Sequence, residues 1–122
     1  MIVAWDCDGT LIVPVVTTDN LGGLDMPNYE VIAIYRWFQS QGHRMIIWSG
    51  GGVDYARMWA EKLGLNPDFI IPKTKESAKE YGVDICFDDC IVDLADKNFR
   101  VKRVNNYIKR KEWNEHKLEE AS

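Results

Sequence analysis

The chain has 122 residues, the length of one ordinary domain, and 46% of them are hydrophobic and 28% charged. This profile excludes a disordered polypeptide, and no apolar run is long enough to span a bilayer. The start of the chain lacks the basic region of a signal peptide, and Asp6 interrupts its apolar run. We therefore expect a cytoplasmic protein without membrane contact, with Cys7, Cys86 and Cys90 as reduced thiols.

The net charge of −4 is unevenly distributed along the chain. Residues 1–96 contain 7 Lys or Arg against 15 Asp or Glu, whereas residues 97–122 contain 8 against 4. A basic segment over 97–111 is typical of a surface that faces a polyanion such as nucleic acid. A solvated terminal helix is the simpler interpretation, and both remain open at this point.

The first half of the chain predicts two strands, two helices and a loop. Residues 2–5 form a continuous apolar run, typical of a buried strand. Residues 12–28 are rich in turn formers and predict an irregular loop or a small hairpin. Residues 29–41 and 53–63 place apolar side chains at helical spacing, each ahead of a glycine. Between them, residues 44–48 predict a second apolar strand, which is followed by a serine and three glycines.

The second half predicts shorter elements. Residues 68–71 are a strand candidate, and 74–81 fit a two-turn helix with a threonine as its N-cap. Residues 83–87 predict another apolar strand that ends in paired acids. Residues 99–104 alternate apolar and basic side chains, which suits an exposed edge strand. Residues 105–122 predict a charged terminal helix or tail.

Strands that alternate with helices over residues 1–122 predict one α/β domain. We expect a parallel central sheet of about five strands with helices on both faces. In such sheets ligands bind beyond the carboxyl ends of the strands. Three of these ends carry polar or glycine residues: Asp6 with Asp8, Ser49 with Gly50, and Asp88 with Asp89. Their convergence at one edge predicts the functional site.

Acidic side chains crowded at this edge predict a metal and a phosphorylated substrate. Asp6, Asp8, Asp88 and Asp89 would repel one another unless a cation lay between them. Mg²⁺ prefers a few carboxylate oxygens together with water and phosphate oxygens. We therefore predict Mg²⁺ as the cofactor, with Asp6, Asp8 and Asp88 as its ligands.

The first pair of carboxylates suits phosphoryl transfer. Asp6 can attack phosphorus and form an aspartyl-phosphate, which divides one difficult displacement into two easier ones. Asp8 can protonate the leaving oxygen and then deprotonate the attacking water. Gly9 lets the backbone turn away from the phosphate, and Thr10 helps to hold that turn and is a candidate substrate contact.

The remaining candidates would stabilise the phosphoryl group. Ser49 and the amides of Gly50 and Gly51 can donate hydrogen bonds to it at a helix N-terminus. A lysine between residues 73 and 79 would neutralise the charge that develops in the transition state.

Four short motifs occur in a characteristic order. DCDGT spans residues 6–10, IIWSG contains Ser49, IIPKTK contains Lys73, and ICFDD ends in Asp88 and Asp89. In these motifs the chain resembles the haloacid dehalogenase (HAD) superfamily of phosphatases. Together they are a far more specific signal than a DxDGT motif alone.

The resemblance covers residues 1–105 and implies a three-layer Rossmann-like fold with a magnesium site. It implies that Asp6 is the nucleophile and a metal ligand. It also implies that Asp8 is the general acid and base, with its backbone carbonyl on the metal. Asp88 would be the direct acidic ligand and Asp89 would lie behind it. Family dehalogenases generally lack the second aspartate of the first motif, so dehalogenation is not expected.

Other consequences of the resemblance concern the lysine and the substrate. Lys73 lies where the family usually places its lysine, and Lys75 is the alternative. The stretch between Thr10 and the helix near residue 29 fits a flap but no cap domain, which implies an open site for a large substrate. We predict a phosphomonoester hydrolase acting on a nucleotide, a nucleic-acid end or a phosphoprotein. The alternative is a non-catalytic phosphate-binding or protein-interaction module, and the oligomeric state is open.

Overall fold

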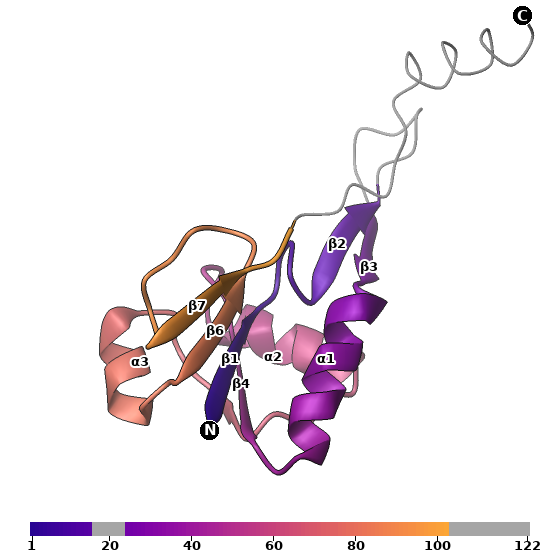
Figure 1. The fold of residues 1–122 in the computed structure, drawn as a ribbon. Coiled ribbons are helices and arrows are strands. Elements are labelled where there is room, and N and C mark those ends of the chain that lie inside the picture. Colours follow the sequence, from indigo (N-terminus) through magenta and orange to yellow (C-terminus); the bar gives the residue numbers. More distant parts are fainter. Residues whose placement is uncertain (16–23, 103–122) are drawn as a thin grey trace, which may run out of the picture.

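A computed structural model describes residues 1–15 and 24–102; residues 16–23 and 103–122 lie outside the description. Its elements are β1 (Ile2–Asp6), β2 (Ile12–Val15), β3 (Leu24–Pro27), α1 (Tyr29–Ser40), β4 (Arg44–Trp48), α2 (Val53–Lys62), β5 (Phe69–Ile70), α3 (Lys75–Tyr81), β6 (Ile85–Asp88) and β7 (Lys97–Arg100). The predicted α/β class is confirmed, because the described chain forms a five-stranded parallel sheet with three helices (Figure 1).

The strand order places the first strand at the centre of the sheet. The order is β5-β4-β1-β6-β7, and β1 pairs in parallel with both β4 and β6. Its residues Val3, Ala4 and Trp5 are fully buried, as the continuous apolar run predicts. In the register of these pairs Asp6 is level with Trp48, and Trp5 is level with Phe87. The carboxyl ends of β1, β4 and β6 therefore meet at one edge.

Helices lie on both faces of this sheet. One apolar cluster joins Val3 and Trp5 of β1 to α1 and α2, and the other joins Ala4 to α3. The difference follows from the alternation of side chains along a strand. Figure 1 shows α1 and α2 on one side and α3 on the other. Trp5 stacks on Phe87 with ring centroids 4.3 Å apart, which fixes β1 against β6 on the α1 side.

The start of α3 is set by a side-chain cap. Thr74 is extended, and its hydroxyl oxygen accepts a hydrogen bond of 3.1 Å from the amide of Ser77. Gly82 ends the helix in the left-handed conformation. The predicted helix over 74–81, with Thr74 as its N-cap, is therefore confirmed. The cap leaves Lys73 in the connection just before the helix, where its side chain can turn to the sheet edge.

The predicted flap is a hairpin in its described part. β2 and β3 pair antiparallel, with Ile12 opposite Pro27, and residues 16–23 between them lie outside the description. The hairpin returns to the core beside the first turn of the chain, because the amide of Asn28 donates to the carbonyl of Leu11 at 2.8 Å. The described hairpin thus lies beside the edge of the sheet at which β1 ends with Asp6.

The predicted bounds of the last strand are wrong. The alternation over 99–104 suggested that stretch, but β7 spans Lys97–Arg100. The reason is its partner: β6 ends at Asp88, which pairs with Arg100, so the described strand ends there, and residues 103 and 104 lie outside the description. All four residues of β7 are exposed, as expected for an edge strand. The predicted terminal helix or tail over 105–122 lies outside the described residues.

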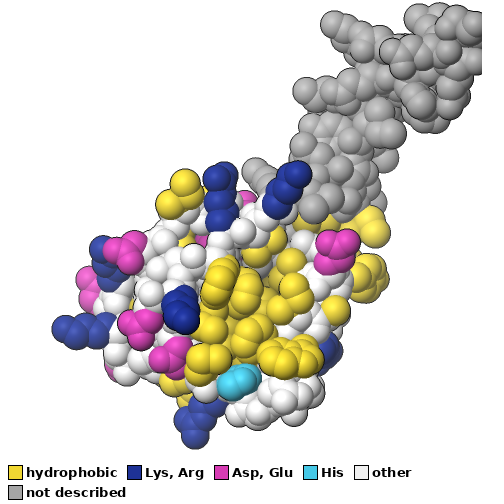
Figure 2. Space-filling view, in the orientation of Figure 1, with side chains coloured by type: hydrophobic (Ala, Val, Ile, Leu, Met, Phe, Trp, Pro, Cys, Tyr) yellow, Lys and Arg dark blue, Asp and Glu magenta, His cyan; other side chains and the backbone are white. Residues whose placement is uncertain are grey.

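Part of the sheet face beside α1 carries exposed apolar side chains. Figure 2 shows them gathered at the centre of this view, over β7 and α1. A groove of about 460 Å³ on this side is lined by Ile34, Phe87 and Phe99 among others. None of the helices in the described part of the chain is long and apolar enough to cross a membrane.

Candidate active site

Three segments that are distant in sequence bring two carboxylates and one ammonium group together. Asp6 is the last residue of β1 and Asp88 the last residue of β6. Lys73 reaches both: its Nζ lies 3.1 Å from Asp6 Oδ1 and 2.5 Å from Asp88 Oδ2. Asp6 is 5% exposed and Asp88 0%. The edge of the sheet therefore holds a buried cluster in which one lysine is shared by two carboxyl groups.

Burial and crowding change the protonation of this cluster. Burial first and the neighbouring Asp88 second raise the pKa of Asp6 to about 7, although Lys73 opposes the shift. Burial lowers the pKa of Lys73, but its hydrogen bonds and charge contacts with Asp88 and Asp6 outweigh that effect and raise it to about 12. Lys73 is thus a cation at neutral pH, and Asp6 holds its proton more tightly than an ordinary aspartic acid does.

The turn after β1 contacts the side chain of Asp6. The hydroxyl of Thr10, a fully buried residue, donates to Asp6 Oδ2 at 3.4 Å. Gly9 has a φ of +78°, a conformation that side chains disfavour, and a side chain there would also meet the carboxylate of Asp89. Thr10 therefore contacts the predicted nucleophile, while its predicted contact with substrate stays a prediction.

Asp8 lies in a different environment from Asp6. It is exposed, and its Oδ1 accepts a hydrogen bond of 2.7 Å from the phenol of Tyr55, in the first turn of α2. Burial first and the hydrogen bond to Asp8 second raise the pKa of Tyr55 to about 12. The phenol is therefore a donor at neutral pH. The two aspartates of the first motif form one buried and one exposed carboxyl group, which suits two different chemical roles.

Ser49 and the glycines after it form the turn from β4 into α2. Ser49 is buried, and its Oγ accepts a hydrogen bond of 3.0 Å from the amide of Gly51. Its carbonyl accepts another, of 3.1 Å, from the amide of Gly52. Gly50 and Gly51 are exposed just ahead of the helix N-terminus, a favourable place for an anion. Binding of a phosphoryl group by Ser49 and Gly50 stays a prediction.

The paired acids at the end of β6 have different partners. Asp88 Oδ1 accepts a hydrogen bond of 2.9 Å from the amide of Cys90, and its Oδ2 pairs with Lys73. Asp89 is half-buried, lies against Gly9, and shares a side-chain hydrogen bond with Asp6 that also raises the pKa of Asp6. The second acid of the pair therefore reaches the predicted nucleophile directly.

The described side chains contain one group with a spacing suitable for a metal ion. Ligand atoms of Asp88, Asp89 and Cys90 lie within 4.8 Å of one another. This set overlaps the predicted ligands only at Asp88. A hard cation such as Mg²⁺ takes carboxylate oxygens and not a thiol, so the two aspartates are its chemically suitable members.

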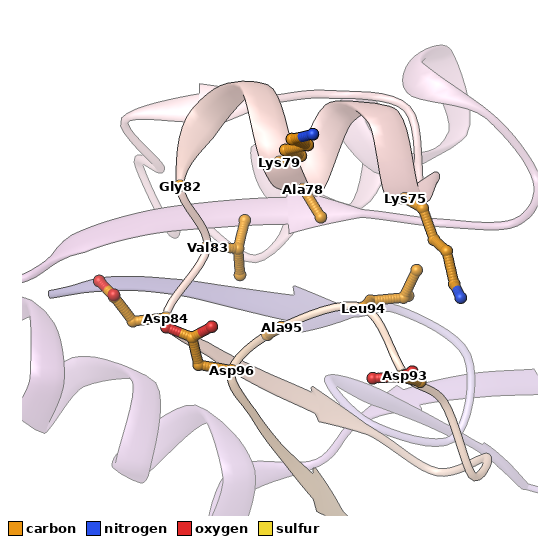
Figure 3. Close-up of a pocket in the computed structure, with 10 residues that line it drawn as sticks. All are labelled: Lys75, Ala78, Lys79, Gly82, Val83, Asp84, Asp93, Leu94, Ala95 and Asp96. Carbon is orange, nitrogen blue, oxygen red and sulfur yellow. The ribbon is translucent and has the colours of Figure 1, made fainter.

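Lys75, the alternative to Lys73, lies in a different place. Figure 3 shows Lys75 and Lys79 on α3 beside a pocket of about 480 Å³ whose other wall carries Asp93 and Asp96. The carboxylates at the ends of β1 and β6 do not line this pocket in the described part of the chain. Of the two lysines, the structure brings Lys73 to the sheet edge.

The three cysteines are free thiols near the same edge. Burial raises the pKa of Cys7 and of Cys86 to about 12 in each case. Cys90 is exposed, and the charge of Asp89 raises its pKa as well. Thiols that remain protonated at neutral pH are poor nucleophiles, so these cysteines are poor candidates for a nucleophile.

Sequence reasoning did not identify Tyr55. Its position in the first turn of the helix after the glycine-rich turn is the signal that could have found it. The basic segment predicted over 97–111 is described only as far as Lys102. Lys97, Arg100 and Lys102 are exposed within it, and the rest lies outside the description.

Comparison of the chain with protein-family models, with curated proteins and with solved structures found no match. Function is therefore inferred from the residues of this chain and their geometry.

Proposed function

We propose that the chain is a Mg²⁺-dependent phosphomonoester hydrolase that works through an aspartyl-phosphate on Asp6. The observation that carries this proposal is the position of Lys73 between Asp6 and Asp88, at the carboxyl ends of two adjacent parallel strands. A nucleophile and a charge-neutralising cation are the two protein groups that phosphoryl transfer needs most closely placed.

In the first half of the reaction an oxygen of Asp6 forms a bond to phosphorus. The bond from phosphorus to the leaving oxygen breaks, and the carboxyl group of Asp8 gives its proton to that oxygen. Asp8 suits this role because it is exposed, two residues beyond the buried nucleophile. Lys73 offsets the negative charge of the transferring group.

In the second half a water molecule attacks the phosphorus of the aspartyl-phosphate. Asp8, now ionised, takes a proton from this water, and the bond between phosphorus and Asp6 breaks. Phosphate leaves, and both aspartates return to their starting states. The buried hydroxyl of Thr10 holds the side chain of Asp6 through both halves.

The donor set at the edge fits a divalent cation. Two buried carboxyl groups share one lysine, and the resulting repulsion is part of what raises the pKa of Asp6. We propose that Asp6, Asp88 and the backbone carbonyl of Asp8 hold Mg²⁺, with Asp89 beside them. The ion supplies positive charge that keeps Asp6 ionised and that polarises the phosphoryl group.

The fold and the substrate class follow as parts of the same proposal. A parallel sheet with β1 at its centre and helices on both faces supports the three-layer Rossmann-like HAD fold. The described part of the flap is a short hairpin, so we infer an open site that admits a nucleotide, a nucleic-acid end or a phosphoprotein. The exposed side chains of Lys97, Arg100 and Lys102 favour a nucleic-acid end among these. Free thiols beside the site favour the reducing cytoplasm.

The test is a phosphatase assay of the purified full chain with 4-nitrophenyl phosphate, in Mg²⁺ and in EDTA. We expect turnover in Mg²⁺ that EDTA abolishes and that the Asp6→Asn variant lacks. Asp93→Asn is the matched control, because Asp93 is an exposed carboxylate away from the sheet edge. A second matched pair compares the lysines: Lys73→Met should lower kcat by about 10²–10³, and Lys75→Met by less than about twofold.

An aryl phosphate reports only the chemistry, so a panel of nucleotides, phosphorylated DNA and RNA ends, sugar phosphates and phosphopeptides follows. The preferred substrate should show the same dependence on Mg²⁺ and on Asp6. Absence of turnover on the whole panel would overturn the proposal in favour of a non-catalytic binding module.

A further inference from the structure

Tyr55 makes the shortest described hydrogen bond to the proposed acid and base. Its phenol donates to Asp8 Oδ1 at 2.7 Å across 47 residues of sequence. The ring is half-buried, and it packs against the glycine-rich turn, since a Cβ built on Gly51 would lie 3.2 Å from the ring. The side chain therefore joins two parts of the site that come from different strands.

A donor on one carboxyl oxygen determines what the other oxygen can do. With Oδ1 accepting from the phenol, a proton on the carboxyl group of Asp8 belongs on Oδ2, because a protonated Oδ1 would compete with the phenolic hydrogen. The bond also fixes the rotation of an exposed side chain that would otherwise sample several rotamers. Proton transfer needs a donor held within hydrogen-bond reach of its target.

In this hydrogen bond Tyr55 is always the donor and Asp8 the acceptor. An ordinary tyrosine has a pKa of about 10, so the phenol of Tyr55 keeps its hydrogen at neutral pH and donates it to Asp8 Oδ1. Tyr55 itself takes no part in proton transfer in this arrangement.

We propose that Tyr55 is a positioning residue that holds Asp8 with Oδ2 directed to the leaving group. The inference rests on the proposed phosphatase reaction. In the first half of that reaction the proton on Asp8 Oδ2 passes to the leaving oxygen as its bond to phosphorus breaks, while Oδ1 remains bonded to the phenol. The alignment of this transfer depends on Tyr55.

The dependence on the leaving group tests this role. An alkyl phosphate has a poor leaving group that requires protonation, whereas 4-nitrophenyl phosphate has a good one that requires little. The Tyr55→Phe variant should lose about tenfold or more in kcat/KM on the alkyl phosphate and less than about threefold on the aryl phosphate. KM should change little, because the phenol does not contact the substrate.

Two further variants separate positioning from a structural effect. Tyr35→Phe is the matched control: it removes a phenol that donates to the carbonyl of Leu65 at 3.1 Å, away from the site. It should affect both substrates equally. In an Asp8→Asn background, Tyr55→Phe should cause no further loss on the alkyl phosphate, since the group it positions is already absent.

The outcomes are distinct. Equal losses on both phosphates, no loss on either, or an additive loss in the Asp8→Asn background would overturn the role of Tyr55 while leaving the phosphatase intact. A wild-type chain that is inactive on the whole substrate panel would overturn the reaction itself, and the inference with it.

Discussion

Lys73 is shared by two carboxyl groups whose other partners differ. Asp88 is fully buried but is compensated by the Cys90 amide and by Lys73. Asp6 has Lys73 and a longer bond from Thr10, and it lies beside two other acids. A buried carboxyl group that is incompletely compensated is raised in pKa and is costly to ionise. In the proposed reaction its ionised form would bind the cation and bond to phosphorus.

The raised pKa of Asp6 predicts how stability depends on pH in the metal-free protein. Folding raises this pKa from 3.8 to about 7, mainly through burial and then through Asp88. The folded state therefore holds the proton more tightly, and the free energy of unfolding falls as pH rises from about 4 to about 7. Urea unfolding in EDTA at pH 5 and pH 8 measures this fall. We expect a larger fall in wild type than in Asp6→Asn, and equal falls would contradict the shift.

At the scale of the element, the turn between β1 and β2 depends on one glycine. Gly9 has a φ of +78°, and a Cβ there would lie 3.0 Å from Asp89 Cβ and closer still to its carboxylate. Gly42 has a φ of +83° with no atom within 4 Å of a built Cβ. The two positions therefore share the backbone strain, and only Gly9 has the steric conflict.

This comparison predicts two different costs for the same substitution. Gly42→Ala should lower the free energy of unfolding by about 1–2 kcal/mol through backbone strain alone. Gly9→Ala should cost more and should also displace Asp89 from Asp6. Chemical unfolding of both variants measures the difference. In an Asp89→Gly background the cost of Gly9→Ala should approach that of Gly42→Ala, and an unchanged cost would show that the conflict is not with Asp89.

Elements with a strong local signal could be predicted from the sequence. The apolar runs that became β1 and β4 are buried on both faces, and the cap of α3 depends on Thr74 itself. The bounds of β7 could not be predicted, because they depend on where β6 ends and not on the alternation in β7. The hydrogen bond of Tyr55 could not be predicted either. Helical spacing predicts α2, but it does not show which polar side chain of the first turn faces Asp8.

The same distinction applies to the candidate site. Placement of the two aspartates, the serine and the paired acids at one edge followed from parallel strands and could be expected from the sequence. The sequence favoured Lys73 but left Lys75 open as the alternative, since both lie close to the start of α3. The structure separates them because Lys73 precedes the cap and turns to Asp6 and Asp88, whereas Lys75 lies on the helix beside another pocket.

At the scale of the whole molecule, the proposed magnesium site would couple folding to metal binding. Residues 1–96 carry 7 basic against 15 acidic side chains, and several of the acids lie at the carboxyl edge of the sheet. A cation at this edge would relieve repulsion between carboxyl groups that folding brings together. Binding to the folded state alone adds about 2.7 kcal/mol when the ligand is at 100 times its Kd.

Saturating Mg²⁺ should therefore raise the Tm of the full chain by roughly 10 °C at pH 8. The rise should be smaller at pH 5.5, because the proton on Asp6 competes with the cation there. Differential scanning fluorimetry with Mg²⁺ or EDTA at the two pH values measures both effects without any substrate. Asp88→Asn should abolish the rise and Asp93→Asn should retain it. A rise that survives in Asp88→Asn would place the ion away from the sheet edge, and a rise that is equal at both pH values would mean that Asp6 is not among its ligands.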